Sequence, residues 1–240
     1  MLKYISILSL IIHCISCSNT LNKNPNNIPI EQIKLSSSIQ PKYSYSSNQS
    51  YRPTYLGDKQ DSIHIDSVIL NLTPFPELSP QSIHSIDPVV QIRKNHQPDS
   101  NDIRIYVDTS QIIPNLSNHI PSMLGLNAPF HVASYPVFIE NISLDTLFIG
   151  SSIGMPLHLQ ILSPSHTWKK TNQFVPGCGT GEIPYLLCPH SIVIIPHPIT
   201  KGNFKTTFRL AYGYSTFYSN EGDYIYSNEF YGTIDSSFFQ

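Results

Sequence analysis

Short stretches that alternate apolar and polar residues recur about every 8 to 15 residues through the second half of this chain. Glycine, proline and Asn-Ser turns separate them, and no segment carries apolar residues at helical spacing over three turns. This pattern predicts an all-β fold with low helix content, an immunoglobulin-like antiparallel β-sandwich over residues 129–240. Its strands are expected near Tyr135–Asn141, Thr146–Ile149, Pro156–Leu162, Trp168–Gln173, Tyr185–Cys188, Ser191–Ile195, Phe204–Tyr214 and Tyr224–Ile234.

Residues 51–128 form a proline-rich region with further strand patterns. An alternating segment begins at Ile63, and residues 103–107 place isoleucine and valine on one face and polar side chains on the other. Prolines crowd residues 73–99, so regular structure there should be short or at a sheet edge. These extra N-terminal strands either form a separate domain or join the sandwich.

Residues 1–16 predict a lipoprotein signal peptide. Lys3 is followed by an apolar run of about nine residues, which is too short to span a membrane and suits a signal sequence. The run ends at Cys14-Ile15-Ser16-Cys17, which looks like a bacterial lipobox. We therefore expect Cys17 to become the acylated N-terminus. An ordinary secretory signal cleaved nearby is the alternative.

Residues 17–50 are expected to form a disordered tether after the lipidated cysteine. They are rich in Asn, Ser, Pro and Gln and show neither helical nor strand periodicity. A flexible coil of this length reaches about 30 Å, which would hold a domain clear of lipid headgroups.

The cysteines fit an exported protein. Once Cys14 is removed and Cys17 is acylated, Cys178 and Cys188 remain in a compartment that permits disulfides. Their pairing would stabilise the fold by roughly 2 to 3 kcal/mol. The alternative is a reactive thiol or half of a metal site, which requires a partner that the sequence does not identify.

The charge balance argues against nucleic-acid binding. Only 12% of the residues are charged and the formal net charge is -2, so no basic stripe attracts phosphate. A chain of 240 residues is also long enough to bury a sufficient core without a cofactor, and we expect none.

Two glycine-rich motifs resemble catalytic or phosphate-binding loops. Residues 150–154 match the G-x-S-x-G nucleophile elbow of hydrolases, but the alternating residues 157–161 predict a strand where the elbow needs a helix. Residues 177–181 resemble a phosphate loop, but prolines flank them and no helix follows. We interpret both as turns.

Histidines and carboxylates are scattered without ligand or catalytic spacing. We expect surface histidines and no metal site, with a site assembled from distant strands as the alternative. The histidines after the signal peptide are His64, His84, His96, His119, His131, His158, His166, His190 and His197. Solvated charges are expected rather than a glycosidase pair. They are Glu140, Asp145, Glu182, Glu221, Asp223 and Glu229.

Aromatic residues crowd the last thirty positions. Tyrosine suits sheet packing, and it also suits recognition of sugars or proteins, because it combines a large area with a hydroxyl group. Alternation turns about half of these side chains outward. The outward set that could form a binding patch is Tyr218, Tyr224 and Tyr226.

Several stretches together resemble uncharacterised Bacteroidetes lipoproteins with an immunoglobulin-like C-terminal region. They are Tyr135–Gly150, Trp168–Lys169, Cys178–Gly181, Lys201–Leu210 and Tyr226–Gly232, with similar segments at Tyr55–Asp58 and Ile105–Ser110. The likeness covers roughly residues 50–240 and implies no activity. Residues 18–22 are neutral, which leaves both the periplasmic and the surface face of the outer membrane open.

We therefore expect a non-enzymatic, lipid-anchored protein of the cell envelope, held by palmitate-type acylation, with a structural or protein-interaction role. The first alternative is a surface module that binds glycan or a protein ligand through aromatic residues. The second is a hydrolase.

Overall fold

The computed structural model describes residues 28–38, 51, 53–65, 69–70, 98–115, 132–151, 154–171, 184–213 and 224–239. The predicted signal peptide, Cys17 and Cys178 lie outside these residues. The elements are η1 (Ile30–Gln32), β1 (Lys34–Ser36), β2 (Tyr55–Asp58), β3 (Ser62–His64), β4 (Ile69–Leu70), β5 (Ile103–Val107), β6 (Ile113–Asn115), β7 (Val132–Asn141), β8 (Leu147–Ser151), β9 (Leu157–Leu162), β10 (Trp168–Lys170), β11 (Pro184–Leu187), β12 (Ser191–Pro198), β13 (Phe204–Tyr212), β14 (Ile225–Tyr226), β15 (Phe230–Ile234) and η4 (Ser236–Phe239).

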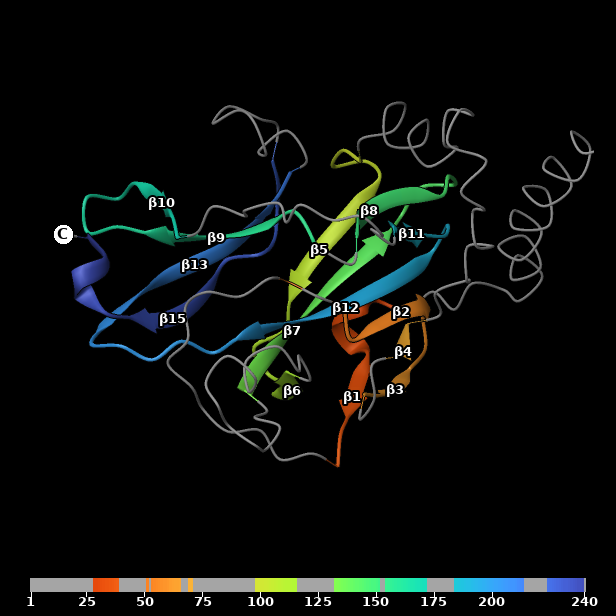
Figure 1. The fold of residues 1–240 in the computed structure, drawn as a ribbon, viewed down its shortest axis with the longest axis horizontal. Coiled ribbons are helices and arrows are strands. Elements are labelled where there is room, and N and C mark those ends of the chain that lie inside the picture. The colour runs from red at the N-terminus through yellow and green to blue at the C-terminus, as the bar shows by residue number, and fades with distance from the viewer. Residues whose placement is uncertain are drawn as a thin grey trace, which may run out of the picture.

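Two layers of strands make up the molecule (Figure 1). The first, here called the β12 sheet, has the order β4-β2-β12-β7-β5, with β6 beside β7. The second, the β13 sheet, has the order β10-β9-β13-β14, with β15 also pairing with β13. The β8–β11 pair is a separate two-stranded sheet whose buried side chains join the main core.

The strand order is that of an immunoglobulin-like sandwich, which confirms the predicted all-β fold class. β5-β7-β12 in one sheet and β9-β13-β15 in the other reproduce the A-B-E and C-F-G pairings. β2 pairs antiparallel with β12, in the place of strand D. β2, β4, β5 and β6, which come from residues 51–128, therefore belong to the same sheet as β7 and β12, whereas β3 pairs with β1.

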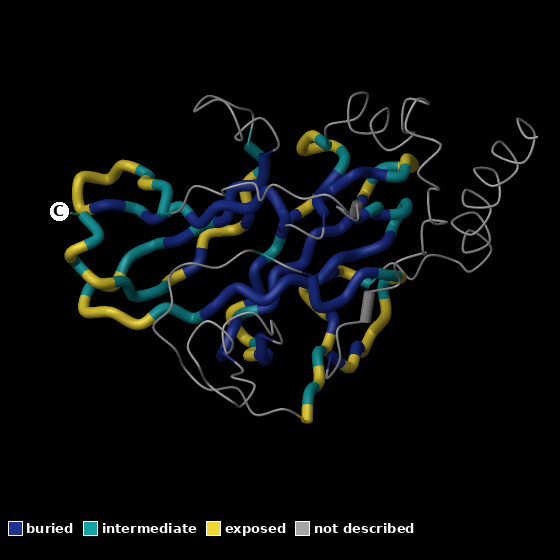
Figure 2. The backbone as a smooth tube through the Cα atoms, viewed as in Figure 1, coloured by how far each residue is buried: buried dark blue, intermediate teal, exposed yellow. Residues whose placement is uncertain are grey.

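The main core lies between the two layers. Alternation turns Val137, Ile139, Val193 and Ile195 inward from the β12 sheet, where they meet apolar side chains of β8, β9, β11 and β13. Figure 2 shows that buried residues run through the centre of both sheets and that exposed residues lie at the turns. Burial of each large aliphatic side chain stabilises the fold by about 1.5 to 3 kcal/mol.

Two prolines lie opposite each other in the middle of the β7–β12 ladder. Pro136 is the register partner of Pro196. Proline has no backbone N–H. Two prolines can therefore face each other only at a non-hydrogen-bonded pair of the antiparallel ladder. The carbonyl oxygen of Pro136 instead accepts the N–H of Asp108 at 3.0 Å, on the β5 side.

A side-chain amide joins the edges of the two sheets. Asn228 Oδ1 accepts the N–H of Val107 at 2.7 Å, and its Nδ2 donates to the carbonyl oxygen of the same residue at 3.1 Å. These two bonds replace a backbone pair between β5 and the β14–β15 edge. They satisfy polar groups that an open sheet edge would expose.

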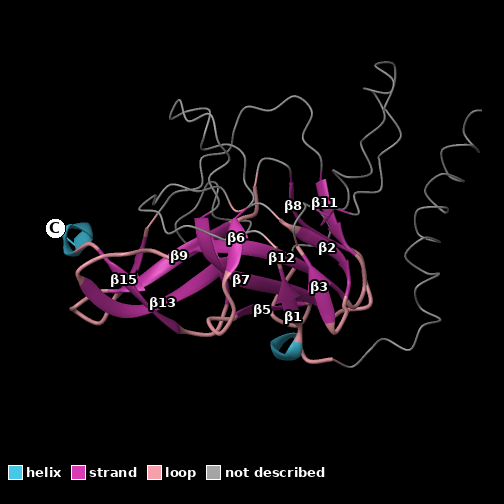
Figure 3. Ribbon diagram, turned by 90° about the horizontal axis from the view of Figure 1, so that it is seen from below, coloured by secondary structure: helices cyan, strands magenta, loops and turns pink. Residues whose placement is uncertain are grey.

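The predicted tether is wrong for residues 28–38. This stretch, here called the strap, forms η1 and β1 on the outer face of the β12 sheet (Figure 3). Ile30 and Ile33 are fully buried there against Phe138, Ile192 and Ile194. The apolar residues of the strap are too few to show periodicity, but each one fits a sheet face that would otherwise expose aliphatic side chains.

Hydrogen bonds hold the strap along its length. Gln111 donates from Nε2 to the carbonyl oxygen of Ile33 at 2.9 Å and accepts the N–H of Leu35 at 2.8 Å. On its other side, β1 pairs with β3, and this pairing is parallel. The β2–β4 pairing is also parallel, so the described strands are not all antiparallel as predicted.

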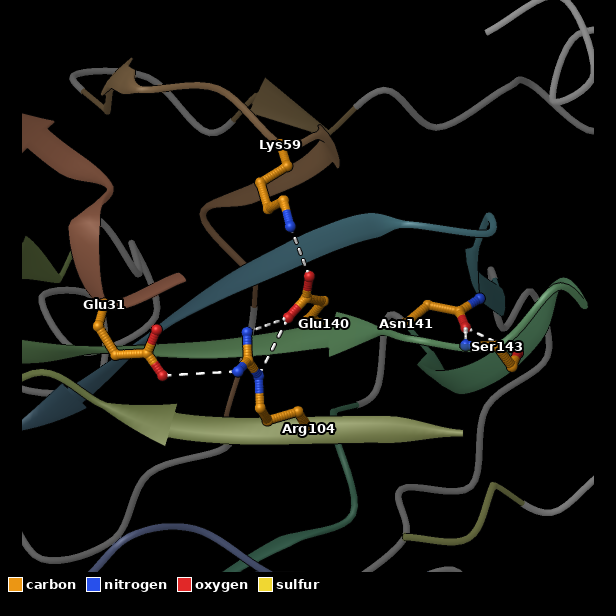
Figure 4. A network of polar contacts seen from close by, with 6 residues as sticks. All are labelled: Glu31, Lys59, Arg104, Glu140, Asn141 and Ser143. Carbon is orange, nitrogen blue, oxygen red and sulfur yellow. Dashed lines mark hydrogen bonds and ion pairs between the residues drawn. The ribbon is translucent and has the colours of Figure 1, made fainter. Parts of the chain in front are cut away.

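Glu140 is not the solvated charge that the sequence suggested. It lies on the strap-facing side of β7 with a side chain only 7% exposed. Its carboxylate accepts bonds from Lys59 Nζ at 2.7 Å and from Arg104 Nη2 at 2.6 Å, and Arg104 also lies 3.7 Å from Glu31 of η1 (Figure 4). Two cations thus compensate one buried carboxylate.

The predicted strands of the second half are present with small shifts at their ends. One differs more, because the segment expected at 224–234 is two strands, β14 and β15. Ser227 separates them, since its N–H donates to the carbonyl oxygen of Leu210 and its Oγ accepts the N–H of that residue, both at 2.9 Å. The described helical residues are 3-10 turns, which confirms low helix content.

We predict that Ile33→Ala lowers the free energy of unfolding by about 2 to 4 kcal/mol, because it leaves a cavity between the strap and the β12 sheet. Leu144→Ala is the control. Leu144 is 80% exposed, so its truncation should change stability by less than about 0.5 kcal/mol. Urea unfolding of both variants measures the difference, and equal midpoints would restore the tether interpretation.

Candidate functional site

An arginine is held between two aromatic rings on the outer face of the β13 sheet. The Arg209 Cζ lies 4.1 Å from the centre of the Trp168 ring and 3.9 Å from the centre of the Tyr226 ring. The three residues come from β13, β10 and β14, and alternation turns all of them away from the core. Cation–π attraction of about 0.5 to 2 kcal/mol at each ring fixes the guanidinium plane.

The guanidinium keeps part of its hydrogen-bonding capacity. Arg209 Nε donates to Gln160 Oε1 at 2.9 Å, from the neighbouring position on β9. The two terminal nitrogens donate no hydrogen bond to the residues that the structure describes. An arginine fork positioned in this way can take a carboxylate or another planar oxyanion through paired N–H donors. We call Trp168, Arg209, Tyr226 and Gln160 the arginine stack.

Aromatic residues continue the row beyond Tyr226. Tyr224 lies with its ring centre 6.0 Å from that of Tyr226, and His158 meets Tyr224 edge to face at 6.3 Å. Burial, then the charge of Tyr226, raises the pKa of Tyr224. Tyr224 and Tyr226 therefore lie on the outer face, as expected, while Tyr218 lies outside the described residues.

Two histidines differ from the expected surface positions. His158 is on the outer face of the sheet but only 3% exposed, because the aromatic row covers it. His197 lies at the end of β12, also 3% exposed, and its Nδ1 is 3.1 Å from the Tyr51 hydroxyl. Burial lowers the pKa of His197 to about 4 and raises that of Tyr51, so both are neutral near pH 7.

Gly150 and Ser151 end strand β8 and Gly154 precedes strand β9, whereas a nucleophile elbow leads from a strand into a helix; Ser152 and Ile153 lie outside the described residues. Ser151 and Gly154 exchange backbone hydrogen bonds at 2.9 and 3.2 Å, and the chain continues into β9 where a hydrolase would have a helix. The interpretation as a hairpin turn is therefore supported. The glycines at 177–181 lie outside the described residues.

Of the predicted Cys178–Cys188 disulfide, only Cys188 lies among the described residues. Cys188 follows β11 and is disulfide-bonded. It is the one cysteine among the described residues, and its pairing with Cys178 stays a prediction. Within the same residues, no group of three His, Cys, Asp or Glu side chains could hold a metal ion.

Sequence reasoning identified Tyr224 and Tyr226 but missed Trp168 and Arg209. Alternation along 204–212 and 168–170 turns both missed side chains outward, which was available from the pattern. What the pattern could not supply is that β10, β9, β13 and β14 are adjacent in this order. The stack exists only because strand order brings residues 41 and 17 positions from Arg209 to its two faces.

Comparisons of the chain with protein-family models, with curated proteins and with solved structures find no match. The resemblance to Bacteroidetes lipoproteins therefore stays a prediction. In the part of the chain that the structure describes, no helix has the length and hydrophobicity needed to cross a bilayer.

The buried imidazole of His197 predicts acid sensitivity. The unfolded chain binds a proton at this residue below about pH 6.5, whereas the folded protein does so only near pH 4, so stability falls as the pH drops through this window. The loss should be on the order of 3 kcal/mol.

His197→Gln, which can still accept the Tyr51 O–H, should remove this part of the pH dependence of unfolding. His166→Gln, at an exposed position, should keep it. Urea unfolding between pH 4 and pH 7 measures both variants. If wild type and His197→Gln lose stability in parallel, His197 is not buried in its neutral form.

Proposed function

We propose that this protein is a non-enzymatic, lipid-anchored component of the cell envelope that binds a protein partner through the arginine stack, by an acidic side chain of that partner. The observation that carries the proposal is the guanidinium of Arg209, which is held between Trp168 and Tyr226 with its terminal N–H groups free of bonds to the described residues.

Pre-organisation makes this arginine suited to binding. An ordinary surface arginine loses side-chain freedom when it is bound, at a cost of about 0.5 to 1.5 kcal/mol. Arg209 is already ordered by two rings and by Gln160. Tryptophan, tyrosine and arginine are also the residues that dominate protein interfaces, because they combine a large contact area with hydrogen-bond donors.

The ring geometry favours a protein carboxylate over a stacked sugar. A sugar stacks on an open aromatic face, but Arg209 covers one face of Trp168 and one face of Tyr226. Tyr226 itself is 43% exposed, and Tyr231 on β15 is 72% exposed. Tyr226 supplies exposed apolar area beside the guanidinium, and Tyr231 adds a second exposed ring on the same sheet, as expected for an interface.

The membrane anchor is the second part of the proposal. Its support is the lipobox-like Cys14-Ile15-Ser16-Cys17 after a short apolar run, together with the resemblance to Bacteroidetes lipoproteins. The strap begins at residue 28, so the segment from Cys17 to the sandwich would be about ten residues and not thirty. A coil of this length reaches about 18 Å, so the sandwich would lie close to the headgroups.

A photocrosslinking residue in place of Tyr231 tests the binding face. In intact cells of the host, we expect it to yield discrete protein adducts, identified by mass spectrometry. Arg209→Gln should abolish the adducts because it removes the charged fork. Arg209→Lys should reduce them about tenfold, because lysine keeps the charge without paired donors.

Two controls make the crosslinking result specific. The same crosslinker at the exposed Leu144, in the turn between β7 and β8, should give no such adducts. Emission of Trp168, the one tryptophan in the sequence, reports whether each variant keeps the stack. Equal adducts at both positions, or adducts indifferent to Arg209→Gln, would exclude the proposed face, and adducts that carry glycan alone would favour the alternative.

The intact mass of native protein extracted from host membranes tests the anchor. We expect loss of residues 1–16 and a gain of acyl chains at Cys17. Reduction should add about 2 Da, because an intramolecular Cys178–Cys188 bridge takes up two hydrogens. An unacylated mass would refute the anchor, and an unchanged mass on reduction would refute the bridge.

A further inference from the structure

A cavity of about 220 Å³ lies at the end of the sandwich, between the last residues of β12 and the β13–β15 hairpin. Its walls are largely aromatic and come from both sheets. The lining residues that the argument uses are Tyr135, His197, Lys205, Phe208, Phe230 and Tyr231. The volume is below the roughly 300 to 1,000 Å³ of sites for drug-sized molecules, so the space suits a ligand with a single ring.

The packing of the aromatic walls fixes their position. Phe230 meets Phe208, His197 and Tyr135 edge to face, with ring centres 5.6 to 6.3 Å apart. A side chain at Gly232 would overlap the Phe208 ring, so glycine is required there for the close approach of β15 to β13. Interlocked rings therefore form the inner wall of the cavity, and the exposed Lys205 and Tyr231 line its outer side.

His197 brings a buried polar group to this cavity. The hydroxyl of Tyr51 is protonated, because burial raises its pKa, and Nδ1 of His197 is its one side-chain partner among the described residues. We assign the hydroxyl as the donor to Nδ1, because an unpaired buried O–H would cost about 1 to 3 kcal/mol. This assignment places the proton of the neutral imidazole on Nε2.

The Nε2–H donor has no acceptor among the described residues. His197 is 3% exposed and lines the cavity, so a ligand in the cavity can supply the acceptor. Lys205, whose Nζ lies 5.6 Å from the centre of the Tyr231 ring, is the one charged residue among the described lining residues. The cavity thus offers a donor, a cation and aromatic walls, and no carboxylate from these residues.

We propose that this cavity binds a small carboxylate with a single planar ring. The ring packs between Phe208, Phe230 and Tyr135, and the carboxylate accepts the Nε2–H of His197 and faces Lys205. A water molecule could satisfy the histidine alone, but it would leave the aromatic walls without contacts. This site lies at the end of the sandwich, and no residue of the arginine stack lines it.

Benzoate is the probe, and the full chain purified in detergent is titrated with it by calorimetry and by saturation-transfer NMR. Benzyl alcohol and benzylamine, which keep the ring and change the charge, are the matched ligands. We expect saturable binding of benzoate at one site, with at least tenfold weaker binding of benzyl alcohol and none of benzylamine.

Two variants locate the binding. Lys205→Gln, at an exposed position, should weaken benzoate binding about fivefold to tenfold, and His197→Phe should abolish binding. Arg209→Gln, which alters the other candidate site, should leave it unchanged. Absence of saturable binding, equal affinity for benzoate and benzyl alcohol, or benzoate affinity unaffected by Lys205→Gln would each overturn the proposal, even if His197→Phe fails to fold.

Discussion

β12 is buried on both of its faces, and the rest of the structure follows from this constraint. All eight positions of β12 are buried, with Val193 and Ile195 on the sandwich side and Ile192 and Ile194 on the other. One face is covered by the β13 sheet, as in any sandwich. The other needs its own cover, and the strap with β3 supplies it. A polar segment before the sandwich therefore becomes part of the core.

Side-chain amides bond the backbone N–H and C=O groups that the strand ladders do not pair, and ion pairs compensate a buried charge. Asn228 bonds the backbone N–H and C=O of Val107 at the edge of β5, as a neighbouring strand would. Gln111 bonds the backbone C=O of Ile33 and the N–H of Leu35 in the strap. Glu140 lies under the strap with Lys59 and Arg104 as its partners, so the charge is compensated where water is excluded. Each of these interactions satisfies polar groups where two layers meet. Left unpaired and buried, these groups would destabilise the fold by more than the surrounding contacts stabilise it.

The outer face of the β13 sheet is built differently. Its rings pack against cations and against one another, which orders Arg209, Tyr226 and Tyr224 while leaving polar edges to solvent. The interior end of the sandwich combines aromatic walls with a neutral imidazole. These two places differ in chemistry, since one presents a charged fork at the surface and the other a neutral donor within a cavity.

The sequence by itself determined the fold class, most strand positions and the direction in which most side chains point, because an alternating pattern encodes which face of a strand is apolar. It also determined that β8 is followed by a strand and not by a helix. Only the tertiary structure decided that Ile30 and Ile33 are core residues, that Glu140 and His158 are buried, and that Arg209 lies between Trp168 and Tyr226. Periodicity describes one strand at a time, whereas burial and stacking depend on which strands become neighbours, and that order is set by the packing of the whole chain.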